Sequence, residues 1–250
     1  MHYMASCSFG KDSLAMVLRL IEENKPLDEV AFYDTGMEFQ AIYNVRDRLL
    51  PLLAEKGIKY TELKPDRPFL YDMIEKPVES KQKGKHNGYG WCGGNCRWGT
   101  TQKLKAIKKY KSTILDNVID YVGIAADESD RFERAKQEGK RLPLVEWGMT
   151  EADCLQFCHE KGYYWLERSF GTGIDCIDLY DILDRVSCWC CSNKNLKELR
   201  NVYHYLPQYW SKLSYLQGRI DRPFKGTYRG NPNGIFELEK RFEKEDSDDV

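Results

Sequence analysis

The sequence predicts an α/β protein: a doubly wound, mostly parallel sheet with helices on both faces, plus a small helical, cysteine-bearing C-terminal extension. Short apolar segments alternate with segments of helical periodicity through the first half of the chain, which favours this class. The 250 residues are 42% hydrophobic and 31% charged, which excludes a disordered chain, a collagen-like repeat and a coiled coil. No apolar run approaches the ~20 residues that a membrane span needs. The first residues also lack the pattern of a secretory signal, so we expect a cytoplasmic protein without membrane contact.

The first elements alternate strictly between extended and helical patterns. They are, in chain order, a strand over 3–7, a helix over 14–23, a strand over 28–33, a helix over 41–56 ended by Gly57, and a strand over 58–63. The next are a long loop over 76–99, a basic helix over 101–111, a strand over 118–124 and an extended segment over 142–147. Thr150 should then cap a helix, with Asp153 at the capping-box position.

We find no repeat and no low-complexity linker, so we expect one core domain with a C-terminal extension. The core domain should span residues 1–191. A helical extension over 192–235 should hold two short helices within 196–216, broken at Pro207. An acidic, flexible tail should follow over 236–250.

Charge is uneven although the net charge is only -1. The segment Lys76–Lys111 holds ten Lys or Arg residues against one acid, Glu79. Such a segment suits phosphates, a nucleic acid or a sulfur-donor protein as partner. A solvated loop and helix face explains the same pattern equally well.

The nine cysteines form an odd set in a chain expected to be cytoplasmic, which disfavours a disulfide framework. Two groups stand out: Cys92 with Cys96, and Cys188 with its neighbours Cys190 and Cys191. Thiolates suit zinc or iron–sulfur clusters. Of the scattered cysteines, we interpret Cys7, Cys154 and Cys158 as small buried hydrophobic residues.

The polar turn from Ser8 to Ser13 stands between a predicted strand and a predicted helix. Gly10 allows close approach of the backbone to a phosphate, and Lys11 adds a cation. The hydroxyl groups of Ser8 and Ser13 and the helix N-terminus add further donors. The spacing is not that of a Walker A loop. An ordinary strand-to-helix turn with a serine cap is the alternative.

This turn, Ser-Phe-Gly-Lys-Asp-Ser, resembles the SGGKDS loop of the PP-loop ATP pyrophosphatases, the adenine nucleotide alpha-hydrolase superfamily, with Phe9 at a glycine position. The segment 34–39 resembles the DTGxEF motif of phosphoadenylyl-sulfate (PAPS) reductases. The segment 123–131 resembles their GxRxDES motif, with Ala125 where Arg is common, and 143–153 resembles the PLxxWxxxD region. The matches run in family order from about residue 3 to 191.

The resemblance implies a nucleotide across the carboxyl ends of the strands. Lys11 and Asp12 would be catalytic, and Mg²⁺ would lie near Asp34 and Thr35; alone, Asp34 would be interpreted as a helix cap. The residues implied in binding ATP or a PAPS-like nucleotide are Ser8, Gly10, Lys11, Asp12, Ser13, Asp34, Thr35, Asp127, Glu128 and Arg131.

The adenylyl-sulfate branch of the family holds a 4Fe–4S cluster on a cysteine pair and a later CxxC. By this resemblance the metal ligands would be Cys92, Cys96, Cys188 and Cys191, although Cys92 and Cys96 are not adjacent as in the family pair. Zn²⁺ is the alternative metal. Cys190 is then the candidate catalytic sulfur carrier.

We therefore expect a PAPS reductase-like enzyme that activates a target by AMP-forming cleavage of ATP, in sulfur transfer or sulfur metabolism. The family's reductases carry their nucleophile in an ECGLH-like segment, which this sequence lacks. A reductase of PAPS or adenylyl sulfate would therefore need another nucleophile. A non-catalytic subunit that binds nucleotide or nucleic acid, and a zinc-stabilised structural module, remain alternatives. A homo-oligomer is left open.

Overall fold

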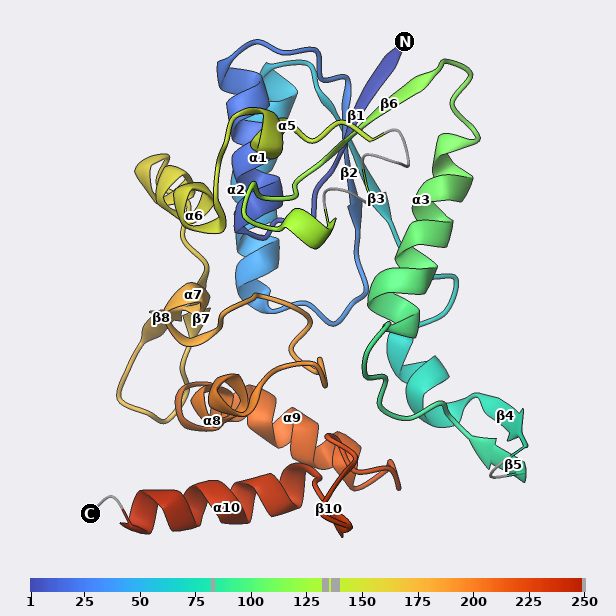
Figure 1. Ribbon diagram of the computed structural model, residues 1–250, viewed down its shortest axis with the longest axis vertical. Helices are drawn as coiled ribbons and strands as arrows, with labels where there is room; N and C mark the ends of the chain where they lie inside the picture. The colour runs from blue at the N-terminus through green and yellow to red at the C-terminus, as the bar shows by residue number, and fades with distance from the viewer. Residues whose placement is uncertain (82–83, 132–134, 136–139, 249–250) are drawn as a thin grey trace. The chain divides into compact units, whose positions relative to one another are not determined.

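The computed structural model describes residues 1–81, 84–131, 135 and 140–248 (Figure 1). The chain forms two compact units, each built from several segments. The first unit comprises residues 1–34, 40–64 and 103–165, and the second comprises 35–39, 65–102 and 166 onward. The expected boundaries after residues 191 and 235 both fall inside the second unit.

A four-stranded parallel sheet forms the centre of the first unit, and it confirms the predicted fold class. Its strands are β1 (His2–Ser6), β2 (Glu29–Tyr33), β3 (Lys59–Leu63) and β6 (Val118–Val122). They lie in the order β3-β2-β1-β6. Ser6 pairs with Ala31 on one side and Val122 on the other, so β1 has neighbours on both sides. The chain leaves β1 for β2 and later returns to the opposite side, which makes the carboxyl end of β1 the topological switch point.

Helices cover both faces of this sheet (Figure 1). They are α1 (Lys11–Glu22), α2 (Gln40–Glu55), α3 (Lys103–Lys111), α5 (Pro143–Glu146) and α6 (Glu151–Glu160). α1 packs against α6, whereas α3 packs against β2. On the α3 side, Met4, Ala31 and Ile107 form one buried cluster. Burial of such apolar faces drives helices onto a sheet.

Two local predictions for the first unit had different outcomes. The predicted cap of α6 is confirmed: Thr150 Oγ1 accepts a hydrogen bond from the backbone N–H of Asp153, whose carboxylate accepts one from the Thr150 N–H in return. The prediction of an extended segment over 142–147 is wrong, because the helix α5 occupies most of it. Pro143 stands at the first helical position, where its fixed φ favours a helical turn.

The second unit consists of short hairpins and helices. The π-helices η1 (Tyr71–Glu75) and η2 (Arg97–Gln102) flank the antiparallel pair β4 (Pro77–Ser80) and β5 (Gly84–Asn87). Two further antiparallel pairs are β7 (Leu166–Arg168) with β8 (Cys176–Asp178), and β9 (Thr227–Tyr228) with β10 (Asn231–Pro232). The loop expected over 76–99 therefore contains a hairpin. Its strands expose most of their polar side chains, so no apolar alternation marked them in the sequence.

The C-terminal helices of this unit are α7 (Leu179–Ile182), α8 (Leu196–Tyr205), α9 (Pro207–Gln217) and α10 (Ile235–Asp248). The predicted break at Pro207 is confirmed, because this residue starts α9. The prediction of a flexible tail over 236–250 is wrong as far as residue 248, because α10 packs against α9. Residues 249–250 lie outside the described part. Ile235, Leu238 and Phe242 recur at helical spacing and are buried.

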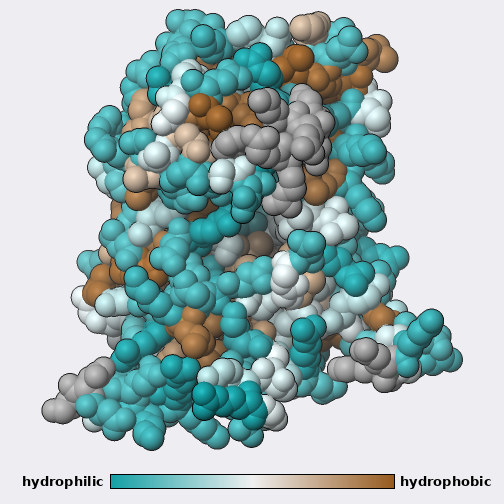
Figure 2. All heavy atoms as spheres, in the orientation of Figure 1, coloured by the Kyte–Doolittle hydropathy of each residue, from teal (hydrophilic) through white to brown (hydrophobic). Residues whose placement is uncertain are grey.

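None of the helices in the described part of the chain is long and apolar enough to span a bilayer. The face in Figure 2 is mostly hydrophilic, and this includes the surface at the position of α10. The acidic composition of residues 236–248 therefore marks the solvent face of an amphipathic helix.

Docking of α10 can be tested with two phenylalanines of the same helix. Phe242 is 1% exposed and Phe236 is 42% exposed. We expect Phe242→Ala to lower the free energy of unfolding by about 3–5 kcal/mol through loss of buried area and a cavity. Phe236→Ala should change it by only about 0.5 kcal/mol. Urea denaturation of both variants measures the difference, and equal effects would contradict the docked helix.

Candidate nucleotide-binding site

The Ser8–Ser13 turn connects the carboxyl end of β1 to the N-terminus of α1, as the sequence predicted. Gly10 is the N-cap of the helix. Ser13 Oγ accepts a hydrogen bond from the Ser8 N–H at 3.1 Å, and it lies 3.2 Å from Ser8 Oγ. The turn thus folds around the Ser13 hydroxyl group. It presents the N-terminal end of α1 at the switch point of the sheet, where anions are bound most readily.

Phe9 occupies the position where the family motif has glycine. Its φ is +58°, a left-handed backbone conformation that glycine adopts without strain, so this position favours glycine. A bulky residue in the left-handed region is uncommon and costs on the order of 1–3 kcal/mol. Here the side chain is fully buried and packs edge-on against Phe32, with ring centroids 5.0 Å apart. The Phe9 carbonyl accepts a hydrogen bond from Trp165 Nε1 at 2.7 Å. Burial and this hydrogen bond hold the loop in a conformation that glycine would otherwise supply.

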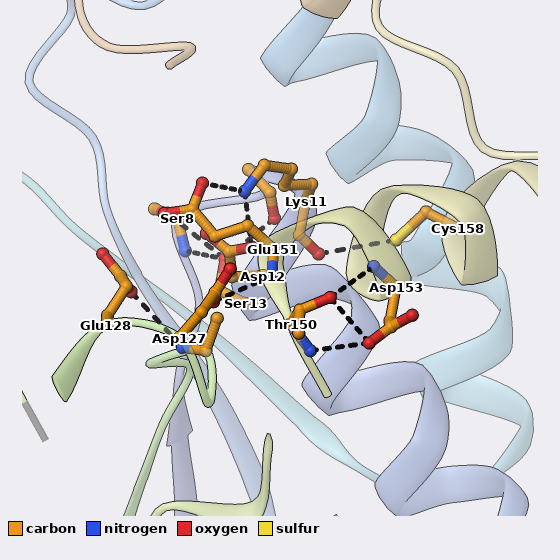
Figure 3. A network of polar contacts seen from close by, with 12 residues as sticks. Ser8, Lys11, Asp12, Ser13, Asp127, Glu128, Thr150, Glu151, Asp153 and Cys158 are labelled. Atoms are coloured by element: carbon orange, nitrogen blue, oxygen red, sulfur yellow. Dashed lines mark hydrogen bonds and ion pairs between the residues drawn. The ribbon is translucent and has the colours of Figure 1, made fainter. Parts of the chain in front are cut away.

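Lys11 is the central cation of the site and is only 6% exposed. Its Nζ donates to Asp12 Oδ1 at 2.8 Å and to Glu151 Oε2 at 2.6 Å (Figure 3). Burial disfavours the charged ammonium, but the two carboxylates outweigh burial and raise the pKa of Lys11. Glu151 was not among the predicted site residues. Its position in the first turn of a helix gave no signal, because the helix dipole favours an acid there in any protein.

Several carboxylates gather beside the loop. Asp12 has a raised pKa, chiefly from burial and with contributions from Glu151 and Glu128, while Lys11 opposes the shift. Asp127 Oδ1 accepts a hydrogen bond from the Glu151 N–H at 3.0 Å. Carboxylates together with phosphate oxygens are typical Mg²⁺ ligands. In the described residues, however, no group of three or more His, Cys, Asp or Glu side chains has a metal-binding arrangement, so Mg²⁺ stays a prediction.

The segment after β6 reaches the loop because of Gly123. A Cβ atom at this residue would lie 2.7 Å from Ser13 Cα, closer than real side chains approach a backbone. The segment then turns back on itself, and Glu128 Oε2 accepts a hydrogen bond from the Ala125 N–H at 3.3 Å. Arg131 forms an ion pair with Glu128. The structure therefore brings Asp127 and Glu128 toward the loop, whereas Arg131 is held through Glu128.

Asp34 and Thr35 directly follow β2 but belong to different units. Asp34 belongs to the first unit and accepts a hydrogen bond from the Tyr43 hydroxyl group at 2.7 Å. Thr35 belongs to the second unit, where its Oγ1 donates to Glu38 Oε1 at 2.8 Å and lies 3.6 Å from Cys188 Sγ. The Thr35 hydroxyl group therefore lies beside a cysteine, a neighbour that the sequence did not indicate.

The five cysteines of the two sequence groups share one neighbourhood of the second unit. Cys92 Sγ accepts a hydrogen bond from the Arg97 N–H at 3.1 Å, and Cys96 Sγ accepts one from the Gly99 N–H at 3.4 Å. Burial raises the pKa of Cys96, and the nearby Cys92 and Cys191 raise it further, while the Gly99 N–H opposes them. Hydrogen bonds of this kind stabilise thiolates and suit metal ligands.

Cys188 fits a metal site less well. Its thiol donates to Glu38 Oε1 at 3.5 Å, and burial together with that carboxylate raises its pKa well above the usual value. No group of three or more metal-ligating side chains is arranged to hold a metal within the part of the chain described. The donor set therefore fits the predicted four-thiolate site only in part, and iron–sulfur or zinc binding there stays a prediction.

Cys190 is 5% exposed, and burial raises the pKa of its thiol far above the ordinary range. A buried neutral thiol is a poor nucleophile. Its role as sulfur carrier stays a prediction that the burial of the side chain does not favour. The scattered Cys7, Cys154 and Cys158 are buried as expected.

The first part of the chain is similar to a known protein family. Residues 2–151, more than half of the chain, match the model of the phosphoadenosine phosphosulfate reductase domain. The chain belongs to this family. The matched region contains the Ser8–Ser13 loop and ends at Glu151, the residue that pairs with Lys11. Cys188 and its neighbours lie outside it.

Two curated relatives and one solved structure resemble the chain. An uncharacterized protein of Methanocaldococcus jannaschii is 27% identical over 223 residues, which cover 84% of this chain and 40% of that protein. The chain thus spans less than half of this relative. The adenosine 5'-phosphosulfate reductase of Staphylococcus haemolyticus is 26% identical over 186 residues, or 69% of this chain and 68% of that enzyme. A U34-tRNA thiolase of Methanococcus maripaludis, solved with its [4Fe-4S] cluster, aligns with 98% of this chain and 71% of its own at 12% identity and a TM-score of 0.42.

The contact between Gly123 and α1 can be tested by adding one methyl group. We expect Gly123→Ala to destabilise the protein by about 1–3 kcal/mol, because the backbone of Ser13 must move away. Gly218→Ala is the matched control, since a Cβ there would meet only ordinary contacts of 3.6 Å and beyond. Urea denaturation compares the two. Equal stabilities would contradict the tight contact.

Thiol accessibility can be tested by labelling with maleimide and identifying the labelled peptides by mass spectrometry. We expect the exposed Cys176 to react in the native protein. Cys7, Cys154 and Cys158 should react only after unfolding, because burial raises the pKa of Cys7 to about 11 and that of Cys154 to about 12. Cys190 should resist likewise. Rapid native labelling of Cys190 in a Cys176→Ser background would instead favour its role as a sulfur carrier.

Proposed function

We propose that this chain binds ATP or a related adenine nucleotide at the Ser8–Ser13 loop and cleaves ATP at the alpha-phosphate to form AMP. The observation that carries the proposal is the buried Lys11 ammonium, held by Asp12 and Glu151 at the N-terminus of α1. A cation, a helix N-terminus and two serine hydroxyl groups at one switch point form an arrangement suited to phosphates.

The contacts of Lys11 suggest how the site works. Asp12 and Glu151 keep the ammonium charged and fix its position before any nucleotide arrives. A fixed cation stabilises charge that develops on phosphate oxygens without first having to reorganise. Mg²⁺, when bound, would neutralise further phosphate charge, and the carboxylates of Asp12 and Asp127 are the candidates to hold it.

The proposed reaction breaks the bond between the alpha-phosphorus and the oxygen that bridges to the beta-phosphorus. Pyrophosphate leaves with that oxygen, and an oxygen of the acceptor forms the new bond to the alpha-phosphorus. The acceptor's proton passes to solvent or to a nearby carboxylate. A sulfide-level sulfur nucleophile then forms a bond to the activated carbon of the acceptor, the bond from that carbon to the adenylated oxygen breaks, and AMP leaves with this oxygen, in keeping with the sulfur chemistry for which the family is named.

An anionic acceptor such as a nucleic acid is supported by the charge of one segment. From Ser80 to Leu115 the sequence holds nine Lys or Arg residues and no acid. Three lysines of α3 in the described structure, Lys105, Lys108 and Lys109, are exposed. Such a helix face attracts phosphate backbones in a salt-dependent way.

A reductase of adenylyl sulfate or PAPS is the second candidate. The similarity to the Staphylococcus haemolyticus enzyme, at 26% identity over 69% of this chain, favours it. Such a reaction needs an accessible thiolate to attack sulfur. The burial of Cys190 and the raised pKa of Cys188 therefore weigh against these two thiols as the nucleophile.

The proposal can be tested by measuring AMP and pyrophosphate release from ATP and Mg²⁺, with and without added nucleic acid. We expect Lys11→Met to lower the rate by about 100-fold or more, because it removes the fixed cation. Lys161→Met is the matched control in the same unit, since Lys161 pairs with Glu22 on the surface. It should behave like the wild type.

Other outcomes separate the alternatives. Nucleotide binding without pyrophosphate release would favour a non-catalytic subunit. Sulfite release from adenylyl sulfate, with a thiol reductant present and without AMP formation from ATP, would favour the reductase. Equal rates for the two lysine variants would remove Lys11 from the mechanism.

A further inference from the structure

A small pocket of about 110 Å³ lies within the second unit. It forms where the chain before Cys92, the chain after Cys191 and the turn before β9 meet. Its lining residues are Trp91, Gly93, Ser192, Arg222, Phe224, Lys225 and Gly226. None of these described lining residues is acidic. Trp91 and Gly93 lie within the region that matches the reductase family, and the other lining residues lie outside it; none of the seven belongs to the proposed nucleotide site.

The two cations of the pocket have hydrogen-bonding capacity to spare. Lys225 Nζ donates to the carbonyl oxygens of Ser192 at 2.7 Å and Lys194 at 2.8 Å, which uses two of its three N–H bonds. Arg222 donates one long hydrogen bond, 3.5 Å, to the Trp91 carbonyl oxygen. In the described part of the chain neither residue forms an ion pair.

A buried tryptophan forms part of the pocket wall. Trp91 is 2% exposed, and its ring packs edge-on against Phe224 with centroids 4.7 Å apart. Its Nε1 has no hydrogen-bond partner among the described residues. A buried N–H without an acceptor costs on the order of 1–3 kcal/mol.

We infer that this pocket binds a small oxyanion of the sulfate and phosphate class. Arg222 and Lys225 supply donors and positive charge, and none of the described residues that line the pocket is acidic; Glu198 acts on Lys225 from outside the lining. The volume excludes a nucleotide, because pockets for ligands of that size occupy roughly 300–1,000 Å³. Burial lowers the pKa of Lys225, and an anion bound beside it would restore the charged form.

The pocket lies next to the two cysteine groups in sequence. Trp91 and Gly93 flank Cys92, and Ser192 follows Cys191. Ser192 Oγ also donates to the Cys92 carbonyl oxygen at 3.0 Å, which ties these two wall segments together. A bound anion would therefore lie beside the chain segments that carry the cysteines.

Isothermal titration of the full chain with sodium sulfate, sulfite and phosphate, at constant ionic strength set by sodium chloride, tests this inference. We expect saturable binding of at least one oxyanion and none of chloride. Arg222→Gln should weaken that binding about tenfold or more, since it removes a charged donor. Trp91→Phe keeps an aromatic ring in the wall but removes Nε1 with the rest of the five-membered ring, and it should weaken binding by a smaller factor.

Arg219→Gln is the matched control, because Arg219 is exposed, donates to the Tyr215 hydroxyl group and does not line the pocket. It should bind like the wild type. Tryptophan fluorescence on urea unfolding shows whether Trp91→Phe is folded; its stability should fall by about 1–3 kcal/mol, because the smaller ring leaves a cavity in a buried position. Lys225→Gln is less suitable, because Lys225 also holds two backbone carbonyls.

Two results would overturn the inference: no oxyanion binding above the chloride background, or equal losses for Arg222→Gln and Arg219→Gln. Tighter binding of sulfate or sulfite than of phosphate would support the pocket and assign it to sulfur oxyanions. The reverse order would support it as a phosphate site. Arg222→Gln should leave AMP release from ATP unchanged, so failure of this inference and failure of the proposed nucleotide site are distinguishable.

Discussion

The parallel pairing of β1 with both β2 and β6 is the constraint on which the candidate nucleotide site depends. It aligns the carboxyl ends of three strands at one edge and makes the end of β1 the switch point. The turn that leaves β1 must therefore deliver the N-terminus of α1 to this edge. Gly123, at the end of β6, then touches the first turn of α1 because it has no Cβ. Sheet order and one glycine together set the position of the loop.

The second requirement of this site is electrostatic. A lysine that is almost fully buried remains charged only if opposite charges offset its loss of hydration. Asp12 comes from the same helix turn as Lys11, but Glu151 comes from α6, which packs against α1. Helix packing in the first unit is thus linked to the charge of the residue proposed to bind phosphates. The carboxylates raise the pKa of Lys11 against the effect of burial, while burial and the neighbouring acids raise the pKa of Asp12.

The second unit shows a different use of charge. Backbone N–H groups donate to the sulfur atoms of Cys92 and Cys96, whereas a carboxylate faces Cys188, so the two cysteine groups differ in their hydrogen-bonding surroundings. Nearby, Arg222 and Lys225 line a pocket without an acid. The proposed oxyanion would supply the missing negative charge. Nucleotide chemistry and anion binding are therefore assigned to separate residues and can be tested separately.

The sequence by itself determined the features that depend on near neighbours in the chain. Apolar periodicity defined the strands and main helices of the sheet, the Thr150 and Asp153 spacing defined a helix start, and Pro207 defined a helix break. The Ser8–Ser13 turn stands between a strand and a helix as predicted, and anion binding there stays a prediction. These features follow from backbone geometry over a few residues, and local patterns report such geometry well.

Only the tertiary structure decided which distant residues complete each site. Glu151 contacts Lys11 across 140 positions, and Glu38 contacts Cys188 across 150. The acidic residues of α10 predicted a flexible tail until packing of Phe242 showed a docked helix. A side chain's partner across such separations is set by how helices and loops pack, and no local pattern encodes it. Composition gave the charge of each segment, while packing decided which charges meet.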